Sequence, residues 1–133
     1  MKRYLVLYLV TAIVFLPLDF LFLGTLGKRV FTAQVGDMLG EVRLVPAVLF
    51  YLLYVAGIVT FANGPAAAGW PSALLNGALF GLFCYATFEL TALALLKHWT
   101  WTVVALDMSW GILVTAASAA LGLAIAEAIA AKV

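Results

Sequence analysis

Three carboxylic acids lie inside long apolar stretches of this sequence: Asp19, Glu89 and Asp107. A charged side chain in the hydrocarbon of a bilayer costs several kcal/mol, so such residues usually face the interior of a helix bundle or a cavity. Buried carboxyl groups that exchange protons suit proton coupling or general acid–base catalysis. We expect at least one of the three to be protonated near neutral pH, because burial and mutual repulsion disfavour the charged form.

The three acids are spaced so that they reach one depth from the same membrane face. Each lies eight or nine residues from a basic residue that ends its apolar run. The pairs are Asp19 with Lys28, Glu89 with Lys97, and Asp107 with His98. A rise of about 1.5 Å per residue puts each acid about 12–14 Å below that face, close to the middle of a hydrocarbon core of about 30 Å. A single acid could merely hydrogen-bond a neighbour, but three at one depth indicate a common site.

Polar aromatic side chains share helix faces with two of the acids. Tyr85 precedes Glu89 by four residues, and Trp110 follows Asp107 by three, spacings that place both members of each pair on one face. We therefore treat Tyr85 and Trp110 as candidate substrate-binding residues. Ordinary packing of the rings is the alternative for each of them.

The second apolar stretch carries no acid but offers three further candidate substrate-binding residues. Tyr51 and Tyr54 lie eight and eleven residues beyond Arg43, at a depth similar to that of the acids. Their hydroxyl groups could reach the carboxylates. Arg43, at the mouth of the same region, could pair with an acid or extend its side chain to lipid headgroups.

No metal or cofactor is expected at this site. Three carboxylates fall short of the roughly six oxygen ligands that hard cations take. His98 lies at the membrane surface, and the chain has no Glu-x-x-His pair of the kind found in di-iron bundles. The single cysteine, Cys84, lies in an apolar run, and no Ser–His or Cys–His set for nucleophilic catalysis is recognisable.

The composition is that of a membrane protein. Of the 133 residues 67% are hydrophobic and 10% charged, and the mean hydropathy is +1.19. Soluble domains are about 45–50% apolar and about 25% charged. The composition excludes a soluble globular domain and a disordered chain. A net charge of +1 argues against nucleic acid as a partner.

The apolar runs predict an all-α, integral membrane four-helix transmembrane bundle, with residues 1–133 forming a single transmembrane domain. The helices are expected at about 4–26, 43–62, 72–96 and 102–126, separated by short connections. The first run is longer than the core of a secretory signal, so we interpret it as a retained helix. Gly77 and Gly81 form a GxxxG pair that permits close contact between helices.

The connection between the first two helices has an amphipathic pattern. Its apolar residues Phe31, Val35, Met38 and Leu39 recur at helical spacing. This pattern favours a short interfacial helix within residues 27–40, with a polar loop as the alternative. Orientation stays open, because three Lys and Arg residues lie on the side of the termini and four on the opposite side.

Four motifs resemble a known family, domain of unknown function 2177, over essentially the whole chain. They are LPLDFLFLG (Leu16 to Gly24), PAVLFYLLY (Pro46 to Tyr54), YATFELT (Tyr85 to Thr91) and DMSWG (Asp107 to Gly111). The resemblance implies a small multi-pass protein of the bacterial inner membrane, without an established activity. The family commonly has Tyr-Asp-Leu-Thr-Asn where this chain has Phe88-Glu89-Leu90-Thr91-Ala92, so the carboxyl is retained on a longer side chain and an amide is lost.

Three functions are compatible with these features, and the sequence does not decide whether the protein is an enzyme. The first is a proton-coupled carrier of a small molecule or lipid, working as a homodimer. The small multidrug resistance exporters are similar to it in plan only, with four short helices and an acid in the first. The second is an intramembrane enzyme that modifies a lipid or isoprenoid with paired carboxylates. The third is an accessory subunit of a larger membrane complex. The lipid bilayer is a partner in each case.

Overall fold

The computed structural model describes residues 2–66 and 69–132, and every regular element in these ranges is a helix. Five α-helices are joined by turns, a short 3-10 segment (η1) and a π-helical segment (η2). Their bounds are α1 Lys2–Gly24, α2 Leu26–Val35, η1 Gly36–Met38, α3 Leu44–Ile58, η2 Val59–Asn63, α4 Trp70–Leu95 and α5 Trp101–Lys132. The prediction of an all-α membrane bundle is confirmed.

Four helical stretches are long and apolar enough to cross a membrane. They are Lys2–Gly24, Leu44–Asn63, Trp70–Leu95 and Trp101–Ala131. These stretches correspond to the four expected from the sequence. The last helix differs at its end, which was expected near Ala126, because α5 continues to Lys132. The Ala-rich tail retains high helix propensity and holds no Gly or Pro that would end the helix earlier.

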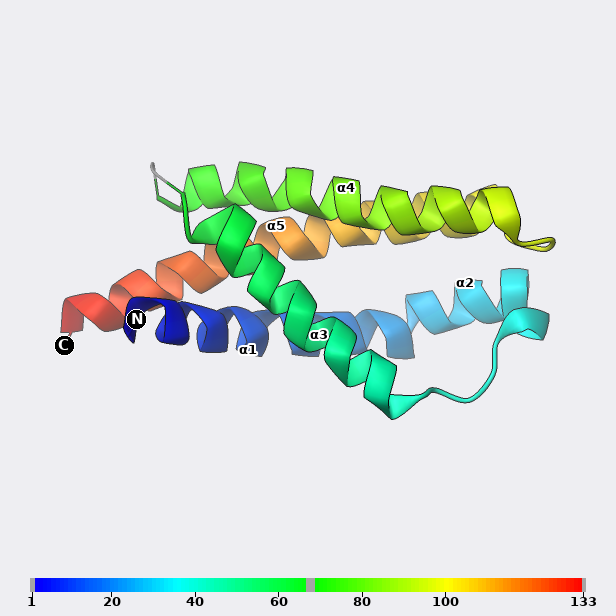
Figure 1. The fold of residues 1–133 in the computed structure, drawn as a ribbon, viewed down its shortest axis with the longest axis horizontal. Coiled ribbons are helices and arrows are strands. Elements are labelled where there is room, and N and C mark those ends of the chain that lie inside the picture. Colours follow the sequence, from blue (N-terminus) through cyan, green and yellow to red (C-terminus); the bar gives the residue numbers. More distant parts are fainter. Residues whose placement is uncertain (1, 67–68, 133) are drawn as a thin grey trace.

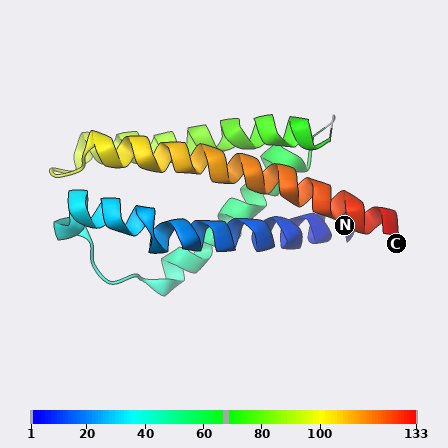
Figure 2. The same ribbon diagram turned by 180° about the vertical axis from the view of Figure 1, so that it is seen from behind.

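The long helices lie roughly along one axis. In both ribbon views α4 and α5 run side by side, and α1 lies along α5 (Figures 1 and 2). Helix α3 crosses this group obliquely, from near the junction of α1 and α2 to the start of α4 (Figure 1). Both described ends of the chain lie at one end of the bundle, and the α4–α5 turn lies at the other together with α2. We call these the terminal end and the turn end.

The short helix expected between the first two spans is present as α2. It continues the direction of α1 in both views instead of turning across the bundle (Figures 1 and 2). Packing explains this direction: Val35 is fully buried, and the ring of Phe31 lies 6.2 Å from that of Trp99 in the α4–α5 turn. Phe31 and Val35 of α2 therefore pack against protein at the turn end.

Helix α3 ends in π-helical geometry that the sequence pattern does not predict. The backbone N–H of Gly64 donates to the carbonyl of Val59 at 3.0 Å, one residue further back than in an α-helix. The side-chain amide of Asn76 satisfies the nearby carbonyl of Ala62 at 3.0 Å. The wider turn leaves Asn63 fully buried in the bundle. Such π-helical turns are rare and often mark functional positions.

The contact between α4 and α5 depends on small residues. A Cβ atom at Gly77 would lie 2.8 Å from the carbonyl oxygen of Thr115, and one at Gly81 would lie 2.5 Å from that of Gly111. In return Gly111 accommodates the ring of Tyr85. The prediction that Gly77 and Gly81 permit close helix contact is confirmed.

Gly81→Ala should separate α4 from α5. The added methyl group meets backbone that cannot move aside without shifting a helix, so we expect a loss of about 1–3 kcal/mol in the free energy of unfolding. Unfolding of the purified protein in mixed micelles measures this loss. The matched control is Gly24→Ala, because a Cβ atom there meets nothing within 4 Å. Equal stability of the two variants would contradict the proposed close contact.

Candidate functional site

Helices α4 and α5 bring two of the acids together. Glu89 is fully buried and Asp107 is 9% exposed. The two acids come from facing helices that pack closely against each other. Two ionised carboxylates side by side in an apolar interior repel each other and lack the water that would stabilise them. This arrangement favours a proton on one of the two acids.

The donors around Glu89 are unequally distributed between its two oxygens. The indole N–H of Trp99 donates to Oε1 at 2.8 Å. No donor among the described residues reaches Oε2, which is buried. A buried oxygen without a donor is costly, which again favours a proton on this pair. Phe31 and Phe88 flank Trp99, with ring centroids 6.2 and 6.1 Å away.

The third acid, Asp19 on α1, has a donor on each oxygen. The hydroxyl of Tyr51 donates to Oδ2 at 2.7 Å, and the indole N–H of Trp110 donates to Oδ1 at 3.0 Å. Asp19 is 5% exposed, so these neutral donors replace water around it. An ionised carboxylate is stabilised by hydrogen bonds of this type. Asp19 is thus better prepared for negative charge than the pair on α4 and α5.

Aromatic packing holds the two donors of Asp19 in position. The ring of Trp110 stacks on Phe22, with centroids 4.6 Å apart and planes 6° from parallel. Tyr51 meets the ring of Phe20 edge to face at 5.5 Å. Both donor side chains are packed against helix α1. They therefore lose little further conformational entropy when they hydrogen-bond to Asp19.

Tyr54 and Tyr85 lie beside the acids without donating to them. The Tyr54 hydroxyl shares a hydrogen bond of 2.7 Å with that of Thr115 on α5. The two tyrosine rings meet edge to face with centroids 5.9 Å apart. Tyr85 lies within electrostatic range of both Asp19 and Asp107. These tyrosines therefore form the side of the acid cluster that faces the terminal end.

The structure thus collects most of the candidate residues in one region, which we call the acid cluster. It consists of Asp19, Tyr51, Tyr54, Tyr85, Glu89, Asp107 and Trp110. Arg43 does not belong to it, because it is exposed at the N-terminal boundary of α3. Among the described residues, no three His, Cys, Asp or Glu side chains are grouped closely enough to hold a metal ion. Asp19 is thus not grouped with Glu89 and Asp107 closely enough for the three to share a metal ion.

Trp99 and Thr115 are parts of this region that the sequence pattern did not indicate. Trp99 lies near a helix end, where tryptophans commonly occupy the headgroup level of a membrane. Its indole instead turns back across the α4–α5 turn to reach Glu89. The ten-residue separation crosses a turn, so no helical periodicity connects the two residues. The partner of Thr115 lies on another helix, and no signal in the sequence points to it.

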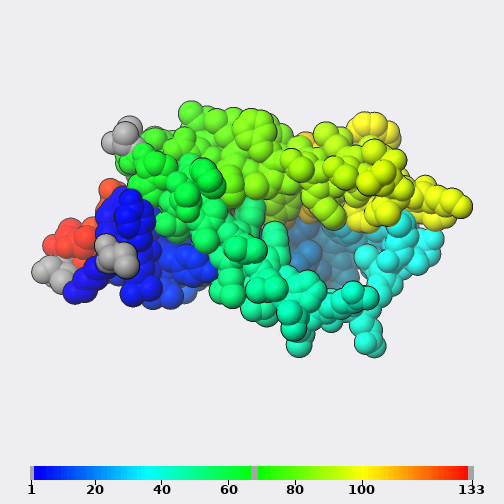
Figure 3. Space-filling view, viewed as in Figure 1, coloured from blue at the N-terminus to red at the C-terminus, as the bar shows by residue number. Residues whose placement is uncertain are grey.

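One side of the bundle is hollowed near the acid cluster. Helix α3 diverges from α4 towards the turn end (Figure 1). In the space-filling view a recess lies between α3, α4 and α2, with α1 visible at its bottom (Figure 3). The visible part belongs to the C-terminal half of α1, the half that carries Asp19. A molecule in the surrounding lipid would meet this recess directly.

Comparison with curated proteins and with solved structures found no match. A family model described as predicted membrane protein (DUF2177) matches residues 4–124. The match overlaps all four helical stretches that can cross a membrane and includes all three acids of the cluster. The chain therefore belongs to this family of predicted membrane proteins.

Proposed function

We propose that this integral membrane protein is a proton-coupled carrier of a small apolar molecule or lipid. The observation that carries the proposal is the burial of Glu89 and Asp107 beside each other, with one carboxyl oxygen of Glu89 that has no donor among the described residues. We expect this pair to hold a proton, because two adjacent negative charges in an apolar interior are unfavourable. Intramembrane acids paired in this manner are typical of proton relays in transporters.

Protonation supplies the coupling. With its proton, the pair is neutral and compatible with a closed, dry interior. Without the proton, two adjacent negative charges repel each other and require hydration, which favours separation of α4 from α5 or an opening towards water. A substrate that binds only one of these two states would therefore be coupled to the proton by the difference in its affinity.

The recess beside the acid cluster supports a lipid-soluble substrate. It opens between α3 and α4 on the side of the bundle (Figure 3). Both helices belong to stretches that are long and apolar enough to cross a membrane. Tyr51 and Trp110 are only partly buried in the cluster. Their rings can therefore contact a substrate while their hydroxyl and indole N–H groups stay hydrogen-bonded to Asp19. Arg43, exposed at the start of α3, stays a candidate for contact with an anionic headgroup.

We further propose that the carrier is a homodimer in the bacterial inner membrane. A four-helix protomer has little room to enclose a pathway, and a second copy would close the open side of the recess. The bacterial inner membrane follows from the resemblance of the four sequence motifs to the family. A partner subunit of a different kind would replace the second copy if the protein is an accessory component.

A lipid- or isoprenoid-modifying enzyme is the second candidate. Its specific support is the difference between the acids: Asp19 is prepared for negative charge, whereas the Glu89–Asp107 pair retains a proton. A general base and a general acid need environments that differ in this sense. The two functions differ in outcome, because an enzyme changes its substrate chemically and needs no pH gradient.

The shared proton can be observed directly. Infrared spectroscopy of the protein in lipid at neutral pH should show the C=O band of a protonated carboxyl, and Asp107→Asn should remove or shift it. Asp37→Asn is the matched control, because Asp37 is exposed in η1. If no protonated carboxyl is visible in the unmodified protein at neutral pH, the paired proton does not exist and the carrier proposal loses its basis.

Transport depends on Glu89. In proteoliposomes with an imposed pH gradient we expect flux of a fluorescent short-chain phospholipid or of a lipophilic cation dye, and we expect Glu89→Gln to abolish its dependence on the gradient. The amide keeps the size of the side chain but no longer exchanges a proton. Glu41→Gln, at an exposed carboxyl outside the spans, should behave like the unmodified protein.

Three other outcomes would contradict the carrier. Gradient-driven flux that survives Glu89→Gln would remove the pair from the coupling step. Chemical conversion of the phospholipid without a gradient would favour the enzyme. Copurification with a larger complex, together with full function of variants neutralised at all three acids, would favour the accessory subunit.

A further inference from the structure

A second group of polar side chains is buried closer to the terminal end. Thr11, Asn63 and Ser118 are each fully buried, and we call them the amide–hydroxyl layer. Ser118 follows Asp107 by eleven residues on α5, which corresponds to about 16 Å along the helix. The layer is therefore separate from the acid cluster, and the proposed proton pair does not need it.

Hydrogen bonding in this layer is incomplete. The Asn63 side-chain amide donates from Nδ2 to the hydroxyl of Thr11 at 3.0 Å and to the carbonyl of Ala119 at 3.1 Å. Asn63 Oδ1 and Ser118 Oγ are buried and have no partner among the described residues. An unsatisfied buried polar group costs about 1–3 kcal/mol. Proteins commonly satisfy such groups with ordered water.

The layer is linked to the acid cluster by one further hydroxyl pair. Thr115 lies three residues before Ser118 on α5, and its hydroxyl is hydrogen-bonded to that of Tyr54 at 2.7 Å. Tyr54 in turn belongs to the acid cluster, where its ring meets that of Tyr85 with centroids 5.9 Å apart. Polar groups thus follow one another along the interior, from the layer to the acids.

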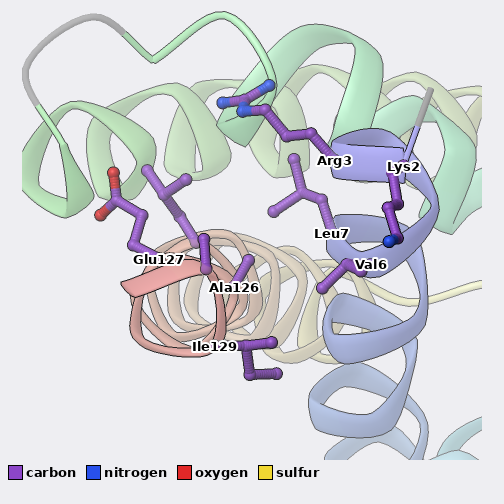
Figure 4. A pocket seen from close by; sticks show the side chains of 9 residues that line it. Lys2, Arg3, Val6, Leu7, Ala126, Glu127 and Ile129 are labelled. Carbon is purple, nitrogen blue, oxygen red and sulfur yellow. The ribbon is translucent and has the colours of Figure 1, made fainter. Parts of the chain in front are cut away.

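On the other side of the layer a cavity of about 390 Å³ opens at the terminal end. It lies between the start of α1 and the end of α5, with Lys2, Arg3 and Glu127 around it (Figure 4). Leu7 and Leu123 also line it but are only 1% and 2% exposed, so they form its floor.

The floor is one helical turn away from the layer. Leu7 precedes Thr11 by four residues, and Leu123 follows Ala119, whose carbonyl binds Asn63, by four. Residues four apart lie on the same helix face. The two leucines therefore separate the polar layer from the cavity. Apolar constrictions of this kind gate water-filled paths by excluding water.

We propose that the amide–hydroxyl layer is a water-binding site, and that its water joins the acid cluster to the terminal cavity across a gate formed by Leu7 and Leu123. Water satisfies Asn63 Oδ1 and Ser118 Oγ. When the two leucines part, this water becomes continuous with water in the cavity. Its role as the route of the proton rests on the proposed function, whereas the site and the gate do not.

Access through the gate can be measured by cysteine labelling. In Ser118→Cys, made in a Cys84→Ala background, a small charged methanethiosulfonate reagent should label the thiol slowly. Leu123→Ala should accelerate labelling by about tenfold or more, because a smaller residue opens an apolar constriction to water. The acceleration should occur only with reagent on the side of the termini, identified by a tag at one end of the chain.

The matched control is Leu113→Ala, on the same helix but 62% exposed, which should leave the labelling rate unchanged. Equal acceleration by Leu113→Ala would indicate a general loosening of the bundle and would contradict the gate. The gate would also be contradicted if Leu123→Ala did not change the labelling rate, or if the reagent labelled the thiol from the side of the α4–α5 turn.

Bound water can be detected without any cysteine. Infrared difference spectra recorded in H₂¹⁸O and H₂¹⁶O should contain the isotope-shifted O–H band of a buried water, and Asn63→Leu should remove it. Asn76→Leu, which deletes the other asparagine of the chain, should retain the band. A folded unmodified protein without such a band would overturn the water site.

Neither measurement needs a substrate or a pH gradient, so the two proposals can fail separately. Labelling and a water band as expected, together with gradient-driven flux that survives Glu89→Gln, would support the water site and the gate but contradict the proposed carrier. Loss of that flux in Glu89→Gln, together with a labelling rate that Leu123→Ala does not change, would support the carrier but contradict the gate.

Discussion

The hydrogen bonding of three carboxyl groups inside an apolar bundle is the constraint on which the rest of the structure depends. A carboxylate in hydrocarbon must either keep a proton or find donors within the protein. Asp19 finds them in Tyr51 and Trp110, one for each oxygen. Glu89 and Asp107 instead face each other, with a single indole N–H from Trp99. The same chemical group is thus held in two different ways within one cluster.

This arrangement requires α4 and α5 to approach closely. Glycines at positions 77, 81 and 111 remove the side chains that would keep the two backbones apart. Hydrophobic attraction contributes little between helices surrounded by lipid, so small residues and buried polar contacts carry much of the association. The glycines therefore permit the close contact of α4 and α5, and this contact brings Glu89 and Asp107 near each other in the interior.

The oblique course of α3 divides the interior into two levels. Towards the turn end α3 diverges from α4, and Tyr51 reaches Asp19 beside the lateral recess (Figures 1 and 3). Towards the terminal end the π-helical segment brings Asn63 into the bundle, where it contacts both α1 and α5. The two levels therefore hold different polar groups: carboxyl groups at the level of Asp19, and amide and hydroxyl groups at the level of Asn63.

The sequence by itself determined the class of the protein, its four membrane-crossing stretches and the shared depth of the acids, because hydropathy and the rise of a helix are local properties. It also indicated that Tyr85 and Glu89 share a face, and so do Asp107 and Trp110. Only the tertiary structure decided that Trp110 donates its hydrogen bond to Asp19 rather than to its neighbour Asp107, and that Trp99 donates to Glu89. It alone revealed the π-helical segment and the Asn63 layer. Those contacts depend on crossing angles and on the rotation of each helix about its axis, which no single stretch of sequence encodes.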